Sequence, residues 1–183
     1  MKRVLYTSFF IVLLDQITKI LVKTNMNLYD EILIFDWFRI HYIENPGMAF
    51  GLELGGEYGK LFLSVFRIFI VIWGVFYIKR MITESNFSKG NLICFGLIIG
   101  GAIGNIVDST FYGVIFNEAN LFYGSVVDML YFPLFEVDLP NFLSFLEGSD
   151  NIFTFFAPRF NIADSSIFIG ISCILIFYRN NFN

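Results

Sequence analysis

Charged residues are scarce in this 183-residue chain, where Asp, Glu, Lys and Arg together make up only 15%. A typical soluble domain contains about a quarter charged residues. Hydrophobic residues make up 56% of the chain, and its mean hydropathy is +0.67. The remaining polar residues are too few to cover one water-soluble core of this length. The composition therefore excludes a soluble domain and indicates a membrane protein.

Cysteine and histidine are almost absent, with two Cys and one His. These numbers exclude a disulfide framework, a zinc finger and an HExxH site, so we expect no metal and no other cofactor. The net charge of −4 argues against a nucleic-acid partner, because nucleic acids bind basic surfaces. No G-x-S-x-G motif is present, and His41 lies in a predicted strand, which together argue against a Ser–His–Asp hydrolase.

Four segments are apolar enough to cross a bilayer, which takes about 20 residues: 4–22, 61–78, 91–107 and 160–178. The fourth reaches spanning length only if Asn161 and Asp164 belong to the helix. The first is expected to be a retained helix rather than a secretory signal. Its apolar run is interrupted by Asp15, Gln16 and Lys19, and no A-x-A-like cleavage site follows it.

The distribution of basic residues predicts the orientation in the membrane. The two termini and the connection between the second and third spans together carry six basic residues and one acidic residue, in Lys2, Arg3 and Arg179 and in segment 79–89. Acidic residues predominate in the other two connections between spans, 23–60 and 108–159. Lys and Arg collect on the cytoplasmic side. We therefore expect both termini in the cytoplasm and two long outer loops. Neither loop shows a repeat or a linker, so residues 1–183 are expected to form one domain.

The first outer loop contains a segment with the pattern of a β-strand. Residues 38–43 alternate between apolar and polar side chains and are rich in β-forming residues. We expect a small sheet from this loop on the outer membrane surface. The predicted fold class is an all-α membrane protein of four transmembrane helices with a small extracytoplasmic sheet.

Every predicted span carries an ionisable residue near its outer end. Asp15 lies about 16 Å and Asp108 about 25 Å along their helices from the cytoplasmic side. Asp164 lies near the outer start of the fourth span, and Arg67 about one and a half turns into the second. Asp128, in an apolar stretch, is a further candidate for this layer. Because charge inside a membrane is costly, such residues mark function by default.

Structural roles are open for three of these acids. Asp15 and Lys19 are four residues apart on one helix and can form an internal ion pair. Asp108 ends a helix and can meet interfacial water. Asp164 lies near a helix start, where a carboxylate interacts favourably with the helix dipole and the free N–H groups. Asp128 has no such explanation.

A carboxylate pair is the chemistry that remains. Two acids within hydrogen-bond distance share one proton, because ionising both is costly. The ionised member then takes a proton from water while the protonated member donates to a carbonyl oxygen. The residue spacing does not decide which two of the four acids form the pair.

Small residues recur along the third span. Gly96, Gly100 and Gly104 occur every four residues on one helix face. Such spacing lets membrane helices approach closely. We expect this packing to deliver Asn105 and Asp108 to a shared cavity.

Five short blocks resemble those of the lipoprotein signal peptidases (signal peptidase II), a family of bacterial membrane aspartic peptidases. They occur in family order over nearly the whole chain. The blocks are LDQITK at 14–19, NPGMAFG at 45–51, GGAIGNIVD at 100–108, VVD at 126–128 and FNIAD at 160–164.

The resemblance implies a role for each matching residue. It assigns the catalytic dyad to Asp128 and Asp164 and a supporting role to Asp15 and Lys19, with Asn45, Gly47, Asn105 and Asn161 orienting the substrate backbone or the dyad. It also implies a four-helix fold with a β-cradle in the bacterial inner membrane, surrounded by membrane lipids. The implied substrates are diacylglyceryl-modified prolipoproteins, cleaved just before the lipidated cysteine, and the implied inhibitor is globomycin.

Two features depart from the family pattern. Asp108 is followed by Ser109, where the family has an arginine, and we hypothesise that Arg67 or Arg159 supplies the missing charge. The segment 131–158 is also longer than usual, and it lies either on the membrane beside the substrate entrance or in an ordinary surface loop. Two other functions stay open: a non-catalytic protein that binds lipoproteins or lipids, and a small ion- or proton-coupled transporter subunit.

Overall fold

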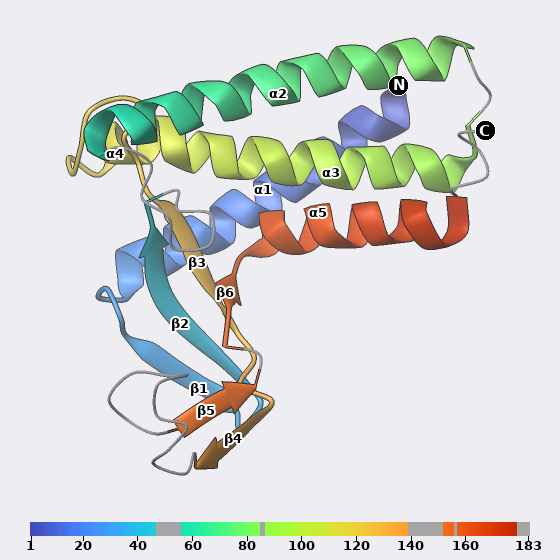
Figure 1. The fold of residues 1–183 in the computed structure, drawn as a ribbon. Coiled ribbons are helices and arrows are strands. Elements are labelled where there is room, and N and C mark those ends of the chain that lie inside the picture. The colour runs from blue at the N-terminus through green and yellow to red at the C-terminus, as the bar shows by residue number, and fades with distance from the viewer. Residues whose placement is uncertain (47–55, 85–86, 139–151, 156, 179–183) are drawn as a thin grey trace.

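The computed structural model describes residues 1–46, 56–84, 87–138, 152–155 and 157–178. Long helices lie side by side, and a small sheet extends away from one end of them (Figure 1). The start of α1 and the end of α5 lie at the opposite end, away from the sheet. Gly47, one of the predicted site residues, lies outside the described residues.

The first three predicted spans, 4–22, 61–78 and 91–107, lie within longer helices, whereas the helix in the fourth, 160–178, begins only at residue 162. These helices are α1 (Lys2–Asn25), α2 (Gly56–Glu84), α3 (Lys89–Val107) and α5 (Ile162–Cys173). A π-helical turn η1 (Asp108–Tyr112) and the short α4 (Gly113–Ile115) continue α3, and a second π-helical turn η3 (Ile174–Tyr178) continues α5. Within the described residues, three helices are long and apolar enough to span a membrane, whereas a further apolar helix, Ile162–Phe177, is shorter. Asp164 belongs to that helix, but Asn161 precedes it as its N-cap.

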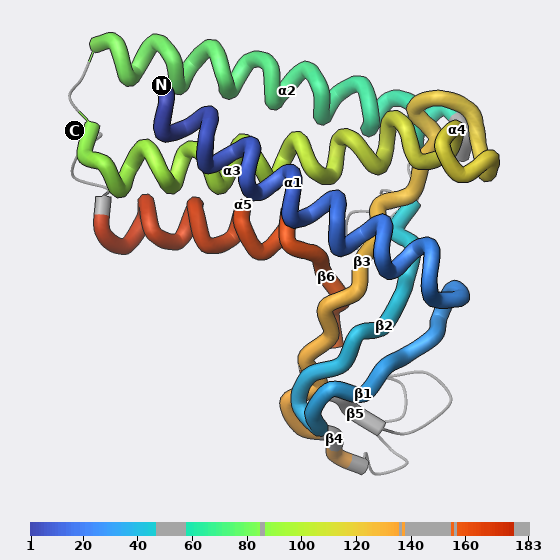
Figure 2. Tube along the Cα trace, turned by 180° about the vertical axis from the view of Figure 1, so that it is seen from behind, coloured from blue at the N-terminus to red at the C-terminus, as the bar shows by residue number. Residues whose placement is uncertain are grey.

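Helix α3 packs against α1, α2 and α5. Helix α1 crosses behind α3 in Figure 1 and in front of it in Figure 2. The predicted glycine face makes the α1 contact: a Cβ on Gly100 would lie 2.9 Å from the Ser8 backbone. The contact with α5 depends on Gly101, where a Cβ would lie 2.3 Å from the carbonyl oxygen of Ala163. Small residues therefore set the distance between the three helices.

Replacing Gly101 by Ala is expected to destabilise the bundle by about 1–3 kcal/mol, because the added methyl overpacks a rigid backbone contact. Thermal unfolding of the purified protein in detergent measures this. Gly74→Ala on α2 is the matched control, because a Cβ there meets nothing within 4 Å. Equal melting temperatures for the two variants would show that the α3–α5 contact does not limit stability.

The sheet is antiparallel and has the strand order β1-β2-β3-β6. Its strands are β1 (Glu31–Phe35), β2 (Phe38–Asn45), β3 (Val126–Tyr131) and β6 (Arg159–Phe160). The expectation that the sheet comes from the first outer loop is therefore wrong for half of its strands, because β3 and β6 come from the second. The run VVDMLY lacks a strand's alternation, because β3 is buried on both faces.

Segment 131–158 contains a second hairpin in its described part. Strands β4 (Phe135–Asp138) and β5 (Ile152–Phe155) pair in antiparallel fashion, and the Phe135 and Phe155 rings stack at 4.6 Å. These residues therefore form paired strands rather than irregular loop, whereas residues 139–151 lie outside the described part.

A small apolar core joins the sheet to the helices. Tyr42, Tyr112, Val127 and Met129 are buried together, and Val22 of α1 and Met26, which caps α1, pack against them. Side chains alternate between the two faces of a strand. Because Val127 and Met129 face this core, Asp128 between them points to the opposite face. The core thereby fixes the direction of the Asp128 carboxyl group.

Candidate active site

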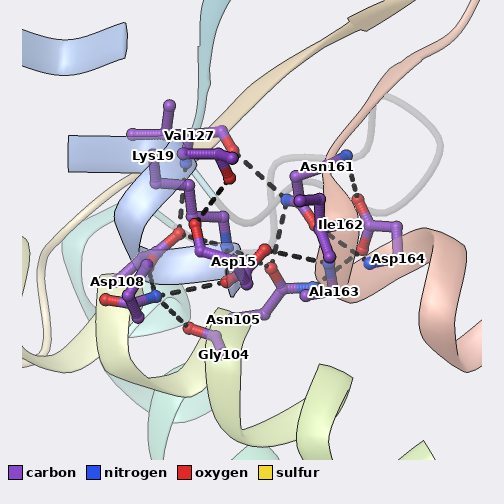
Figure 3. A network of polar contacts seen from close by, with 12 residues as sticks. Asp15, Lys19, Gly104, Asn105, Asp108, Val127, Asn161, Ile162, Ala163 and Asp164 are labelled. Atoms are coloured by element: carbon purple, nitrogen blue, oxygen red, sulfur yellow. Dashed lines mark hydrogen bonds and ion pairs between the residues drawn. The ribbon is translucent and has the colours of Figure 1, made fainter. Parts of the chain in front are cut away.

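Lys19 is the centre of a buried ion cluster between α1 and the C-terminal end of α3 (Figure 3). Its Nζ lies 2.8 Å from Asp15 Oδ2 and 2.7 Å from Asp108 Oδ2, and all three side chains are 0% exposed. The predicted pair of Asp15 and Lys19 is confirmed, with Asp108 as a third member. The alternative that Asp108 meets interfacial water is wrong, because its side chain is inside the protein.

Asp15 also reaches the start of α5. Its Oδ1 accepts a hydrogen bond of 2.8 Å from the backbone N–H of Ala163. This N–H is one of the first in the helix and lacks a partner within it. Asp15 therefore positions the first turn of α5, which also holds Asp164.

Two further residues, which the sequence alone did not place in the site, join the cluster. Gln16 Nε2 donates to Asp108 Oδ1 at 2.8 Å and to the carbonyl oxygen of Gly104 at 3.2 Å. The Tyr112 hydroxyl, from η1, donates to Gln16 Oε1 at 3.1 Å. A polar Gln beside Asp15 in an apolar span was the available signal. Tyr112 gave none, because tyrosine is common at membrane interfaces.

Asn161 links Asp128 and Asp164. Its Nδ2 lies 2.7 Å from Asp128 Oδ1, and its Oδ1 accepts a 2.9 Å hydrogen bond from the Asp164 backbone N–H. The Asp164 carboxylate in turn accepts from the Asn161 backbone N–H at 3.3 Å, which completes a capping box at the start of α5. The helix-start role of Asp164 is confirmed, and the same turn holds it beside Asp128.

Asn105 connects the two halves of the site. Its Oδ1 accepts hydrogen bonds from Lys19 Nζ at 2.9 Å and from Asn161 Nδ2 at 3.1 Å. Its Nδ2 donates to Asp164 Oδ1 at 2.7 Å. Since the amide can donate only from nitrogen, it presents a donor to Asp164 and an acceptor to Lys19. Asp15, Lys19 and Asp108 thus support Asp128 and Asp164 through Asn105.

The site holds more acid than base. Among the described residues, the linked polar side chains of this site include four carboxyl groups, those of Asp15, Asp108, Asp128 and Asp164, and one lysine, Lys19. Full ionisation would leave net negative charge in a poorly solvated place. Burial, together with the nearby negative charge of Asp164, raises the pKa of Asp128 to about 7, against the lowering effects of Lys19, Asn161 and Asn45. Among the described residues, no group of three or more His, Cys, Asp or Glu could hold a metal ion.

The two candidate arginines lie in different places. Arg67, on α2, donates from Nη1 to Ser109 Oγ at 3.2 Å. Arg159, on β6, donates from Nε to His41 Nδ1 at 3.1 Å and lies over the Tyr131 ring, 4.0 Å from its centroid. Arg67 therefore reaches the position at which the family arginine is missing, whereas Arg159 binds within the sheet.

The protein is a bundle of apolar helices with a buried polar centre where the bundle meets a small sheet. These features are those of a membrane protein with a site at one end of its helices. The chain belongs to the signal peptidase II family, a family of proteases: the family model described as Signal peptidase (SPase) II matches residues 7–179.

Named relatives and solved structures agree with this family. The chain is 43% identical to the lipoprotein signal peptidase of Porphyromonas gingivalis, over 92% of this chain and 79% of the relative. It is 38% identical to that of Amoebophilus asiaticus, over 90% and 72%. A solved bacterial membrane enzyme has a TM-score of 0.67 and 26% identity, with coverage of 96% and 92%. A second, at 23% identity, shares the fold with a TM-score of 0.66 over 100% and 91%.

Proposed function

We propose that this protein is an aspartic endopeptidase that removes the signal peptide from diacylglyceryl-modified prolipoproteins, just before the lipidated cysteine. The observation that carries the proposal is that one residue, Asn161, binds both carboxyl groups: that of Asp128 through its side chain and that of Asp164 through its backbone N–H. The names of the relatives supply the substrate class. No cofactor is needed, because two carboxyl groups and water are sufficient for peptide hydrolysis.

The environments of the two acids suggest different roles. Asp128, with its raised pKa, carries the shared proton. Asp164 accepts hydrogen bonds from Asn105 and from the Asn161 backbone, in the first turn of α5 where the helix dipole stabilises negative charge. Asp164 is therefore the base that activates water, and Asp128 is the acid that protonates the carbonyl oxygen.

The reaction then runs in two steps. Asp164 takes a proton from water while the water oxygen bonds to the amide carbon, and Asp128 gives its proton to the carbonyl oxygen. In the second step Asp164 returns a proton to the amide nitrogen, the C–N bond breaks, and Asp128 recovers its proton from the tetrahedral intermediate. The products are a signal peptide with a new carboxylate and a lipoprotein with a free cysteine amino group.

The depth of the site suits a lipid-anchored substrate. Asp108 ends α3 and Asp164 lies in the first turn of α5. These helix ends lie where the helices join the sheet, at the end opposite the start of α1 (Figure 1). With basic residues inside, both termini are cytoplasmic and this end lies in the outer leaflet of the inner membrane. Acyl chains hold the modified cysteine at the same level, which positions the bond before it.

A direct assay tests the proposal. Purified protein in lipid is incubated with a diacylglyceryl prolipoprotein peptide, with the unlipidated peptide as control. We expect cleavage of the lipidated peptide only, and its inhibition by globomycin. Tight binding without cleavage would indicate a lipoprotein- or lipid-binding protein instead, and proton or ion flux through reconstituted vesicles without cleavage would indicate a transporter subunit.

The shared proton predicts the pH dependence of cleavage. Because the pKa of Asp128 is raised to about 7, the pair holds its proton below that pH and loses it above. We expect kcat/KM to fall about tenfold per pH unit well above pH 7, with a midpoint that belongs to the pair. A profile that stays flat up to pH 9 would contradict the acid role of Asp128.

A variant at Asn45 tests the cause of this midpoint. A hydrogen bond from Asn45 lowers the pKa of Asp128. Asn45→Ala removes it, so the alkaline fall of kcat/KM is expected to move to higher pH. A shift to lower pH would contradict this account.

A further inference from the structure

Arg67 is a half-buried cation inside a membrane-spanning helix. It lies nine residues after Tyr58, where the candidate span in α2 begins, and hence about 13 Å along the helix. This is deeper than the sequence alone indicated, because α2 begins before residue 61. Within the described part of the chain, its one polar contact is the bond to Ser109 Oγ, and no carboxylate pairs with it. Such a charge is costly unless it serves a ligand.

Arg67 lies in the wall of an apolar cavity of about 270 Å³. Its lining includes Ile70 and Val71 of α2, Ala102 of α3 and Ile167 of α5. Helices α2 and α5 both pack against α3 rather than closely against each other, which leaves this groove between them. Asn105, which holds Asp164 Oδ1 at 2.7 Å, also lines it. The groove therefore reaches a residue that is hydrogen-bonded to Asp164 of the proposed catalytic pair.

The shape and charge of this groove fit the end of an apolar helix. The last carbonyl groups of a helix have no partners within it and carry partial negative charge, and an arginine is well suited to bind them. The apolar side chains of α2, α3 and α5 suit the body of such a helix, and Ala102 permits close approach. A lipid phosphate also attracts a cation, but phosphates lie at the membrane surface, about 13 Å from this depth.

We propose that the signal peptide of the substrate docks as a helix in the groove between α2 and α5, with Arg67 binding the carbonyls at its C-terminal end. This inference rests on the proposed function. A helical amide is shielded by its own hydrogen bonds, so the chain must unwind before the scissile bond can enter the site. Arg67 replaces the hydrogen bonds lost by the unwound carbonyls, which keeps the next residues extended toward Asp164.

Position 109 offers a way to test the charge separately from the fold. Ser109 Oγ touches Arg67 Nη1, so an arginine at residue 109 can reach the same place from η1. We expect Arg67→Gln to lower kcat/KM at least tenfold, mainly through KM, and Arg67→Lys to recover part of it. The double variant Arg67→Gln with Ser109→Arg is expected to restore most of the activity.

Arg80→Gln is the matched control, because Arg80 lies near the other end of α2, is exposed and pairs only with Glu84 among the described residues. Full activity of Arg67→Gln, or a loss that neither Arg67→Lys nor the double variant repairs, would overturn the inference. Wild-type protein that fails to cleave any prolipoprotein would instead overturn the proposed function, so the two failures are distinct.

Cross-linking identifies the occupant of the groove. A photoreactive residue replaces Val71, which lines the groove, or Phe69, which is 65% exposed and does not line it. Both are placed in the Asp128→Asn variant with bound diacylglyceryl prolipoprotein. We expect cross-links to the signal peptide from position 71 and not from position 69. Cross-links from position 71 to the acyl chains, or equal cross-linking from both positions, would contradict signal-peptide docking.

Discussion

Asp128→Asn and Asp164→Asn are each expected to reduce prolipoprotein cleavage by about 10³-fold or more. General acid or base catalysis by one positioned group contributes about 10²–10⁴-fold, and the two acids act as one unit, so losing either removes most of the effect. Asparagine keeps the size of the side chain but can neither take a proton from water nor transfer a proton to the carbonyl oxygen. Single-turnover cleavage of the lipidated peptide measures the loss.

Stability and binding distinguish this loss from unfolding. Asn at position 128 removes a buried carboxyl group beside another acid, so neither the melting temperature nor substrate binding is expected to fall much. Asp36→Asn, in the exposed turn between β1 and β2, is the matched control and retains full activity. Cleavage at the wild-type rate by either dyad variant would show that the reaction uses other groups.

Lys19→Met is expected to cause the largest loss of stability. Lys19 is the only cation within salt-bridge distance of Asp15 and Asp108 among the described residues, and all three side chains are fully buried. Removing one partner of a buried ion pair costs about 3–5 kcal/mol, because the remaining charge is left uncompensated. We expect a much lower melting temperature in detergent and almost no cleavage, since Lys19 also orients Asn105.

A compensating variant separates the charge from the shape. Adding Asp108→Asn to Lys19→Met removes one of the two uncompensated carboxylates, so part of the lost stability should return. Lys89→Met, at the exposed start of α3, is the control and leaves the melting temperature unchanged. A Lys19→Met protein that melts at the wild-type temperature would show that the buried cluster does not stabilise the fold.

Local patterns explain why much of the fold was predictable. Apolar runs of spanning length define α1, α2 and α3, and the four-residue spacing of Asp15 and Lys19 places both on one helix face. The glycines of α3 predicted close packing, which the contacts of Gly100 with α1 confirm. Each of these inferences needs only neighbouring residues and the geometry of a single helix.

Long-range pairing explains what was missed. Strand β3 is buried on both faces, so its sequence lacks the alternation that revealed β2, and its partner β6 has only two residues. The bond between Asp15 and Ala163 joins residues 148 positions apart. Nothing in the sequence near either residue indicates the other, and only the family resemblance singled out Asp128 and Asp164 from the four acids.

The sequence by itself determined that this is a membrane protein, which residues form most of its helices, and that several acidic residues lie near one end of these helices. Composition and helical period are enough for that, because the bilayer imposes length and polarity on each segment separately. The tertiary structure decided which acids meet: Asn161 joins Asp128 to Asp164, and Lys19 neutralises Asp15 and Asp108 instead. That division depends on how α1, α3, α5 and β3 pack together, and such packing is set by contacts that no single segment contains.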